Sequence, residues 1–261
     1  MSNPDRFLEV TRVAKSFGGV RAVVDCSFSV PRGSCVGLIG PNGAGKSTVV
    51  EMISGFIAPD SGKILFNGQE IQGRPPHRVA ARGLIRTFQL PREWQGLTVM
   101  ENMLLAAKQE GRDAVWRSFF TRRSLKVRME ADVERARQLL ERFGLLALRN
   151  DLAEALSGGQ KRLLEFARIA MRAPLMVLLD EPCAGVNPVL QRNIEEAIVG
   201  LQKDGITVLL IEHNLPFVER ACQDIYVMAE GKTIAQGKLP NLRRMPAVVD
   251  AYLGEVAAAG A

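Results

Sequence analysis

The stretch "GLIGPNGAGKST", residues 37–48, decides the fold of this chain. It holds the pattern G-x-x-x-x-G-K-[ST] between an apolar run typical of a strand and a segment typical of a helix. Glycines in such a loop let backbone N–H groups surround phosphate oxygens, Lys46 adds positive charge, and the Ser47 hydroxyl offers a ligand to Mg²⁺. A glycine-rich turn that binds nothing is the weaker alternative. The predicted phosphate-binding residues are Gly40, Pro41, Asn42, Gly43, Ala44, Gly45, Lys46, Ser47 and Thr48.

A pair of acidic residues supplies the next part of the predicted site. In "LMVLLDEP", residues 175–182, an apolar run ends at Asp180 and Glu181 follows directly. The carboxyl end of such a strand lies level with a phosphate loop, so Asp180 is placed to hold the water shell of Mg²⁺. Glu181 is placed to polarise an attacking water. An acidic pair after a strand is by itself equally typical of a surface turn, but beside a phosphate loop it predicts hydrolysis.

Short apolar runs recur along the chain and indicate a parallel sheet. Strands that helices cover on both faces are apolar throughout, whereas strands with one wet face alternate. Runs of the first kind occur at residues 35–40, 84–88, 175–180 and 207–213. Helical patterns separate several of them, which favours an α/β fold.

The N-terminal part has a different pattern, which predicts an antiparallel portion added to this α/β fold. Residues 23–30, "VVDCSFSV", alternate between apolar and polar positions, as in a strand with one buried face. The residues expected on the buried face are Val24, Cys26, Phe28 and Val30. Two weaker candidate strands are residues 7–13 and 62–69.

Composition bounds the class of protein. The chain has 261 residues, 47% hydrophobic and 24% charged, which suits one large globular domain or a core with an inserted subdomain. We expect no bilayer-spanning segment and no secretory signal, because no apolar run has the required length or position. The four cysteines form no C-x-x-C pair, which argues against a zinc site or a disulfide scaffold. The net charge of +6 suits nucleic acid, an anionic membrane surface or an anionic substrate, without choosing among them.

A second glycine-containing stretch, "ALSGGQKRL" at residues 155–163, precedes another predicted helix. A serine and two glycines before a helix suit an anion at the helix N-terminus, and they equally suit a plain serine-capped helix. The preceding region, from about residue 100 to 150, is rich in Arg, Leu and Glu and predicts a helical insertion.

Five motifs, taken in order, resemble the ATP-binding subunit of ABC transporters over residues 8–240. They are "GPNGAGKST", "TFQ" with Gln89, "LSGGQ", "LMVLLDEP" and "IEH" with His213. The resemblance implies a P-loop NTPase (RecA-like) parallel core with an N-terminal antiparallel β portion and an inserted α-helical subdomain. The implied parts are an ATP-binding core of residues 1–89 and 173–240, a helical subdomain of residues 90–172 that carries LSGGQ, and a C-terminal tail of residues 241–261.

The resemblance also implies ATP and Mg²⁺ as ligands. In this family two subunits meet head to tail, and the phosphate loop of one and the LSGGQ of the other hold the same ATP. Gln89 corresponds to a residue that senses Mg²⁺ and the attacking water, and His213 to one that contacts the γ-phosphate. Phe17 corresponds to an aromatic that stacks on adenine, with a buried core phenylalanine as the alternative. The residues implied to approach ATP on a partner subunit are Ser157, Gly158, Gly159 and Gln160.

Three further stretches, "KSFGGVRAV", "LTVMENMLLAA" and "AGVNP", resemble the importers of branched-chain amino acids, whose relatives carry urea or small amides. A lipopolysaccharide-export ATPase is the alternative. ABC ATPases that act on DNA are less favoured, because they carry a long coiled coil that this chain lacks. Those that act on ribosomes are less favoured, because they usually hold two ATP units and this chain has one. The implied partners are a second ATP-binding subunit (a copy or a paralogue), permease subunits and an extracytoplasmic solute-binding protein, with no nucleic acid. The implied location is the cytoplasmic face of the inner membrane, as a peripheral subunit.

One turn departs from the family pattern. After the acidic pair the family usually has S-A-L-D, whereas this chain has "CAGVN" at residues 183–187. Asn187 stands where an aspartate is common. Followed by Pro188, it predicts the cap of the next helix.

Overall fold

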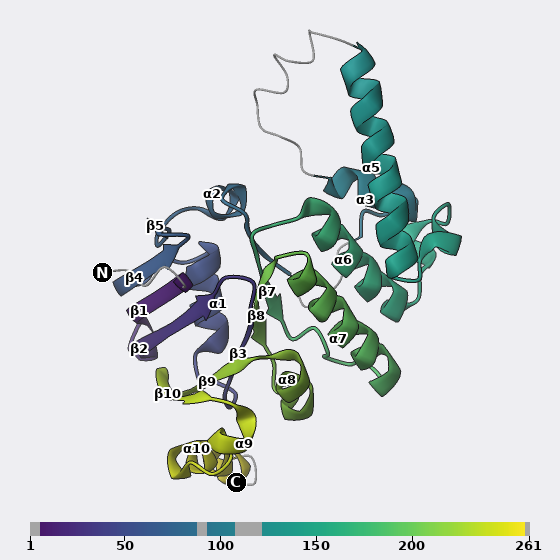
Figure 1. Cartoon of the computed structure of the whole chain (residues 1–261). Helices are drawn as coiled ribbons and strands as arrows, with labels where there is room; N and C mark the ends of the chain where they lie inside the picture. The colour runs from purple at the N-terminus through teal and green to yellow at the C-terminus, as the bar shows by residue number, and fades with distance from the viewer. Residues whose placement is uncertain (1–5, 88–92, 108–121, 259–261) are drawn as a thin grey trace. The chain divides into compact units, whose positions relative to one another are not determined.

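The structure is a computed structural model that describes residues 6–87, 93–107 and 122–258. Contacts along the chain divide it into two compact units. The first unit comprises residues 1–89, 175–185 and 198–261. The second comprises residues 90–174 and 186–197. Each unit is described in turn below, and Figure 1 labels their elements.

The first unit is built on one ten-stranded sheet with the order β5-β4-β1-β2-β10-β9-β3-β8-β7-β6 (Figure 1). Pairing is parallel among β9, β3, β8, β7 and β6, and antiparallel among β2, β1, β4 and β5. This confirms the predicted α/β class with an antiparallel portion. The strands are β1 (Arg6–Phe17), β2 (Val20–Pro31), β3 (Cys35–Ile39), β4 (Ser61–Phe66), β5 (Gln69–Glu70), β6 (Leu84–Arg86), β7 (Met176–Asp180), β8 (Thr207–Ile211), β9 (Asp224–Ala229) and β10 (Lys232–Gly237).

The three central parallel strands are apolar because both of their faces are covered. Every residue of β3, β7 and β8 is buried. Side chains of such strands meet no water on either face, so the sequence has no polar alternation to show. The prediction of parallel strands from the apolar runs at residues 35–40, 175–180 and 207–213 is therefore confirmed.

The predicted buried face of β2 is wrong at one position. Cys26, Phe28 and Val30 are buried as expected, but Val24 is only half-buried and Val23 takes its place. The pairing with β1 explains the change, because Val13 lies opposite Cys26 whereas Lys15 lies opposite Val23. β2 therefore uses one more residue than β1 over this interval. Such a bulge moves the following side chains to the other face of the sheet.

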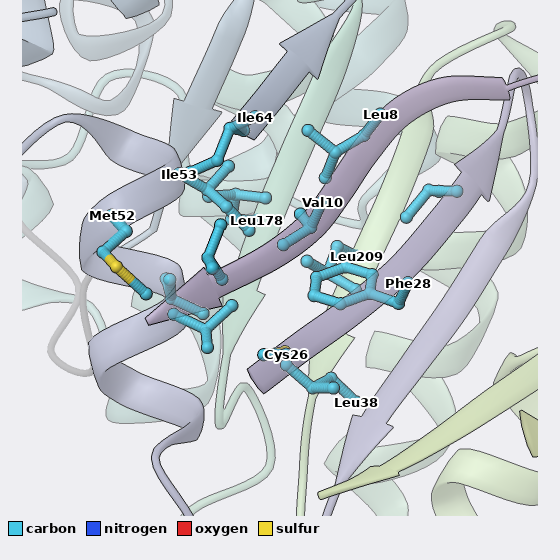
Figure 2. Close-up of a cluster of buried hydrophobic side chains, with 14 of the residues drawn as sticks. Leu8, Val10, Cys26, Phe28, Leu38, Met52, Ile53, Ile64, Leu178 and Leu209 are labelled. Carbon is cyan, nitrogen blue, oxygen red and sulfur yellow. The ribbon is translucent and has the colours of Figure 1, made fainter. Parts of the chain in front are cut away.

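A hydrophobic cluster in the first unit includes the helix that follows the phosphate loop. Helix α1 (Lys46–Ser54) contributes Met52 and Ile53 to it. Figure 2 shows these side chains with Leu8 from β1 and Leu178 from β7, which belong to distant parts of the sheet. Because strands so far apart in the sheet order share one core, the sheet curves around α1. Packing into this cluster therefore holds α1, the helix that follows the phosphate loop.

Strand β10 pairs with β2 through Lys232 and Asp25, which joins the antiparallel and parallel parts of the sheet.

Among the described residues, five further helices belong to the first unit, one of them only in part. The predicted helix cap at Asn187 is confirmed, because its Oδ1 accepts the Leu190 N–H at 2.9 Å at the start of α7. These helices are α2 (Pro76–Ala81), α7 (Pro188–Lys203, which spans both units), α8 (Leu215–Ala221), α9 (Leu239–Leu242) and α10 (Pro246–Ala258).

The second unit is helical in its described residues. Its main helices are α3 (Val99–Ala106), α5 (Arg122–Arg142) and α6 (Gly158–Arg172), with short 3-10 turns η1 (Leu146–Leu148) and η2 (Ala153–Ala155). Helix α3 packs against both α5 and α6, as Figure 1 shows. Helix α3 begins with a capping box in which Thr98 and Glu101 bond each other's backbone N–H. Over the residues that the structure describes, no helix has the length and hydropathy that crossing a membrane requires.

Candidate functional site

The phosphate loop lies between β3 and α1, in the conformation that its glycines permit. Gly45 has a φ of +94°, which side chains other than glycine rarely adopt. A Cβ atom at Gly45 would lie 2.5 Å from the Ala22 carbonyl oxygen, and one at Gly40 would lie 2.1 Å from that of Met228. Both distances are impossible for real atoms. The loop therefore needs these two glycines because the backbones of β2 and β9 pass directly against it.

Lys46, the first residue of α1, is folded back over the loop. Its Nζ donates hydrogen bonds to the carbonyl oxygens of Gly40 at 2.7 Å and Pro41 at 2.8 Å, and the residue is 9% exposed. Since a buried ammonium needs oxygen partners, the loop backbone holds the positive charge inside its own curve. That is the position from which the charge can meet phosphate oxygens bound by the same loop.

Asp180 is buried at the end of β7, where an arginine neutralises it. The residue is 5% exposed, and its Oδ2 accepts a hydrogen bond from Arg86 Nη2 at 2.8 Å. Arg86 belongs to β6, which pairs with β7 in parallel. Sequence reasoning missed this arginine, although a charged residue inside the apolar run "LIRTF" was a usable signal. The arginine offsets the cost of burying this carboxylate.

Glu181 sits in a strained turn beside His213. Its φ is +47°, an uncommon value for a glutamate, and its N–H donates to the Ile211 carbonyl oxygen at 2.9 Å. Its carboxylate Oε1 lies 3.9 Å from His213 Nδ1. The Glu181 side chain is 32% exposed and that of His213 is 63% exposed. The structure therefore brings these two predicted residues together with both side chains open to solvent, as water activation requires.

A buried glutamate that sequence reasoning missed lies beside this pair, with its Oε2 3.9 Å from His213 Nδ1. Glu212 is 1% exposed and its Oε1 accepts the Cys183 N–H at 2.8 Å. Its Oε2 accepts the N–H groups of His213 at 3.1 Å and Asn214 at 3.3 Å. The available signal was an acidic residue at the end of the apolar run "TVLLIEH", where burial demands hydrogen-bond partners.

Of the two predicted residues Phe17 and Gln89, the structure describes only the first. Phe17, at the end of β1, is 47% exposed, so it is not the core residue that was the alternative. Lys15 Nζ lies 5.7 Å from the centre of its ring. Gln89 lies outside the described residues.

The LSGGQ stretch caps helix α6 and leaves one glycine open. Ser157 Oγ accepts the Gln160 N–H at 3.3 Å, while Gln160 Oε1 accepts the Ser157 N–H at 2.9 Å. This capping box satisfies backbone groups that the helix start would otherwise leave unpaired. A Cβ atom at Gly159 would lie 2.8 Å from Leu190, whereas at Gly158 it would meet nothing within 4 Å. Gly159 therefore packs against the end of the Leu190 side chain, and the space beside Gly158 is open.

An ion pair in the same unit holds the start of α6. Lys161 Nζ lies 2.7 Å from Glu93 Oε1, and the Glu93 side chain is 10% exposed. Burial alone would raise the pKa of Glu93, but the hydrogen bond and charge of Lys161 outweigh it, so this pKa lies below its usual value. The pair therefore stabilises the fold when Glu93 is ionised.

Glu93→Gln should lower the free energy of unfolding by about 1–3 kcal/mol at neutral pH, as expected for a lost charged hydrogen bond. The contribution of a carboxylate with a depressed folded-state pKa is present above its unfolded pKa and lost as pH falls through the folded one. Urea unfolding at a series of pH values should thus show the gap to wild type closing below about pH 4. In the matched control Glu70→Gln, whose exposed partner is Lys63, we expect a change below about 0.5 kcal/mol. An equal gap for Glu93→Gln at every pH would contradict the assignment.

The donor set at the phosphate loop fits Mg²⁺. Magnesium is bound through one or two carboxylates, hydroxyls and phosphate oxygens and keeps several waters, so it needs no cage of protein ligands. Ser47 and the buried Asp180 provide a hydroxyl and a carboxylate of this hard-oxygen type. Within the described residues no group of three or more His, Cys, Asp or Glu side chains could hold a metal alone. A hydroxyl and a carboxylate of this type suit a metal that arrives with phosphate.

A parallel sheet, a phosphate loop at the end of β3 and an acidic pair at the end of β7 together define a P-loop nucleotide hydrolase. Comparison with known proteins narrows this class. A family model described as "ABC transporter" matches residues 23–184. The probable branched-chain amino acid transport ATP-binding protein LivG of Archaeoglobus fulgidus is 41% identical over 249 residues, covering 95% of this chain and 96% of that protein.

Two further matches agree with this result. The high-affinity branched-chain amino acid transport ATP-binding protein LivG of Escherichia coli is 38% identical over 256 residues, covering 98% of this chain and all of that protein (100%). A solved ADP conformation of an ATP-binding cassette of an ABC transporter has a TM-score of 0.80 at 34% identity, covering 96% of this chain and 99% of that one. The chain belongs to the ABC transporter family, as its motifs predicted, and hydrolyses ATP to power transport.

Proposed function

We propose that this chain powers the uptake of branched-chain or other hydrophobic amino acids, or of a related small polar solute. One observation carries the proposal: relatives named for branched-chain amino acid transport match along nearly the whole chain, at 41% and 38% identity. The cargo of such a system is selected by other subunits, so the match supports a branch of the family. Urea and small amides stay within the proposed range.

The proposed catalytic cycle assigns one task to each described part of the site. The phosphate loop and Lys46 bind the ATP phosphates, and Phe17 stacks on adenine. Ser47, Gln89 and Asp180 would hold Mg²⁺, which would neutralise negative charge on the phosphates. Glu181 polarises a water for in-line attack on the γ-phosphate. His213 steadies the charge that develops on that phosphate.

The LSGGQ stretch is proposed to act on a second subunit. Ser157, Gly158, Gly159 and Gln160 would bind the γ-phosphate of an ATP held by a partner's phosphate loop. The open space at Gly158 supports this role, because the protein's own packing makes no use of it. In this proposal residues 90–172 serve as the helical subdomain, residues 1–89 and 173–240 as the ATP-binding core, and residues 241–261 as the C-terminal tail.

The proposed assembly follows from these roles. A second ATP-binding subunit, either a copy or a paralogue, closes on two ATP molecules and moves permease subunits in the membrane. An extracytoplasmic solute-binding protein delivers the cargo, and this chain lies at the cytoplasmic face of the inner membrane. Family membership supports a place within a transporter complex.

The test is an uptake measurement in cells that lack this chain. Uptake of radiolabelled leucine, isoleucine and valine should be lost and restored by the wild-type chain, but not by Lys46→Ala. Lys63→Ala is the matched control, because that lysine lies on the surface with its side chain 67% exposed. Unchanged uptake of all three amino acids, with an active ATPase, would assign the chain to another cargo.

A further inference from the structure

One buried carboxylate joins the two segments that carry Glu181 and His213. Glu212 Oε1 binds the backbone of the first segment, through the Cys183 N–H at 2.8 Å. Its Oε2 binds the backbone of the second, through the N–H groups of His213 and Asn214 at 3.1 and 3.3 Å. The two segments come from the ends of β7 and β8, so they are far apart in sequence and adjacent in the sheet.

The bonds that Glu212 makes are specific to a carboxylate. Glu212 is 1% exposed, and a buried carboxyl group needs hydrogen-bond donors for its oxygens. Three backbone N–H groups provide them here, and both oxygens accept. An amide would keep one accepting oxygen but would turn an NH₂ group toward at least one of those N–H groups. An apolar side chain would fill the space and hold neither segment.

Capping of the next helix does not explain Glu212. Helix α8 has its own cap, because Asn214 Oδ1 accepts the Phe217 N–H at 3.2 Å. The bond to Cys183 also points away from α8, toward the turn that contains Glu181. A carboxylate needed only for the helix would make no such bond.

The strained turn explains what the bond is for. Glu181 has a φ of +47°, a conformation that persists only when its surroundings impose it. One restraint is the bond from its N–H to the Ile211 carbonyl oxygen at 2.9 Å. The second is Glu212, two residues further along the turn at Cys183. Both restraints come from the end of β8, which also carries His213.

We propose that Glu212 is a positioning residue, which sets the 3.9 Å separation between Glu181 Oε1 and His213 Nδ1 by binding the backbones of both segments. The inference rests on the roles proposed above for Glu181 and His213. Glu212 itself touches neither the attacking water nor the phosphate. Its effect is therefore expected on the rate of hydrolysis and not on the affinity for ATP.

The first experiment compares Glu212→Gln with a control on the same strand. Thr207→Val, at the other end of β8, removes a fully buried hydroxyl that accepts the Gly33 N–H at 2.9 Å. Glu212→Gln should lower kcat about 10- to 100-fold with ATP affinity unchanged, since small misplacements of catalytic groups have effects of this size. Thr207→Val should keep kcat within about twofold at a similar loss of melting temperature. If Glu212→Gln fails to fold, Glu212→Asp, which keeps the charge but is one methylene shorter, is measured in the same way. A wild-type kcat in the variant that folds, or an equal loss in Thr207→Val, would overturn the proposal.

A double-mutant cycle with His213→Ala then asks whether Glu212 acts through the catalytic pair. If it does, adding Glu212→Gln to His213→Ala should lower kcat by much less than it does in the wild type. Two losses that simply multiply would overturn the proposal. If Glu181→Gln and His213→Ala themselves keep wild-type kcat, the roles proposed for the pair fail, and that result differs from a failure of Glu212 alone.

Discussion

Glu181→Gln is expected to lower kcat by about two to three orders of magnitude and to leave ATP binding intact. The amide has almost the same shape as the carboxylate, so the strained turn and the approach to His213 stay as they are. It cannot take a proton from water or polarise it. ATP binding depends on the phosphate loop and on Lys46, which lie in other segments. Phosphate release measured against ATP concentration, together with equilibrium ATP binding, separates the two effects.

The same variant should accumulate as an ATP-bound dimer, because in the proposed cycle the dimer opens only after ATP is hydrolysed. Gel filtration with ATP should show this dimer for Glu181→Gln and much less of it for the wild type. Glu70→Gln, an exposed carboxylate with its side chain 54% exposed, is the matched control and should behave as wild type in both assays. Retained wild-type turnover in Glu181→Gln would rule out its proposed role.

The parts of the site that follow from local sequence were predictable. The phosphate loop needs glycines where neighbouring backbones approach, and Gly40 and Gly45 meet that requirement within one short motif. Asp180 ends a strand whose burial on both faces leaves an unmistakable apolar run. The cap at Asn187 is likewise a local property, because its bond reaches only three residues along the chain.

The parts that depend on contacts between distant segments were not predictable. The partner of Asp180 is Arg86, and that of the Cys183 N–H is Glu212, and neither pairing has a sequence spacing to reveal it. The bulge that buries Val23 in place of Val24 is a property of the pairing between β1 and β2. The β9–β10 hairpin was not predicted from the sequence either, although Gly231 at its turn has a φ of +75°.

Gly158→Asp is expected to lower ATP hydrolysis about 100-fold or more without harming the fold. The new Cβ would meet nothing within 4 Å, and no left-handed φ is required at this position. An acidic side chain in the first turn of α6 is also favourable to the helix dipole. If this turn meets the γ-phosphate on a partner subunit, the new carboxylate repels it. ATP binding to the isolated chain and the melting temperature should stay at wild-type values, and Gly158→Ala, which adds bulk without charge, should have a smaller effect.

Mixing two inactive variants tests whether the site is divided between two copies of this chain. A Lys46→Ala chain lacks a working phosphate loop but keeps LSGGQ, whereas a Gly158→Asp chain has the opposite defect. Either variant alone forms dimers with both sites damaged. A mixed dimer places the two defects in one site and leaves the other whole, so an equal mixture should recover up to about a quarter of wild-type hydrolysis if sites act independently. No recovery is expected if the phosphate loop and the LSGGQ stretch of one chain bind the same ATP. No recovery is expected either if the natural partner is a paralogue. The isolated Gly158→Asp chain separates these two results, because weakened ATP binding by that monomer occurs only if its own LSGGQ holds its own ATP.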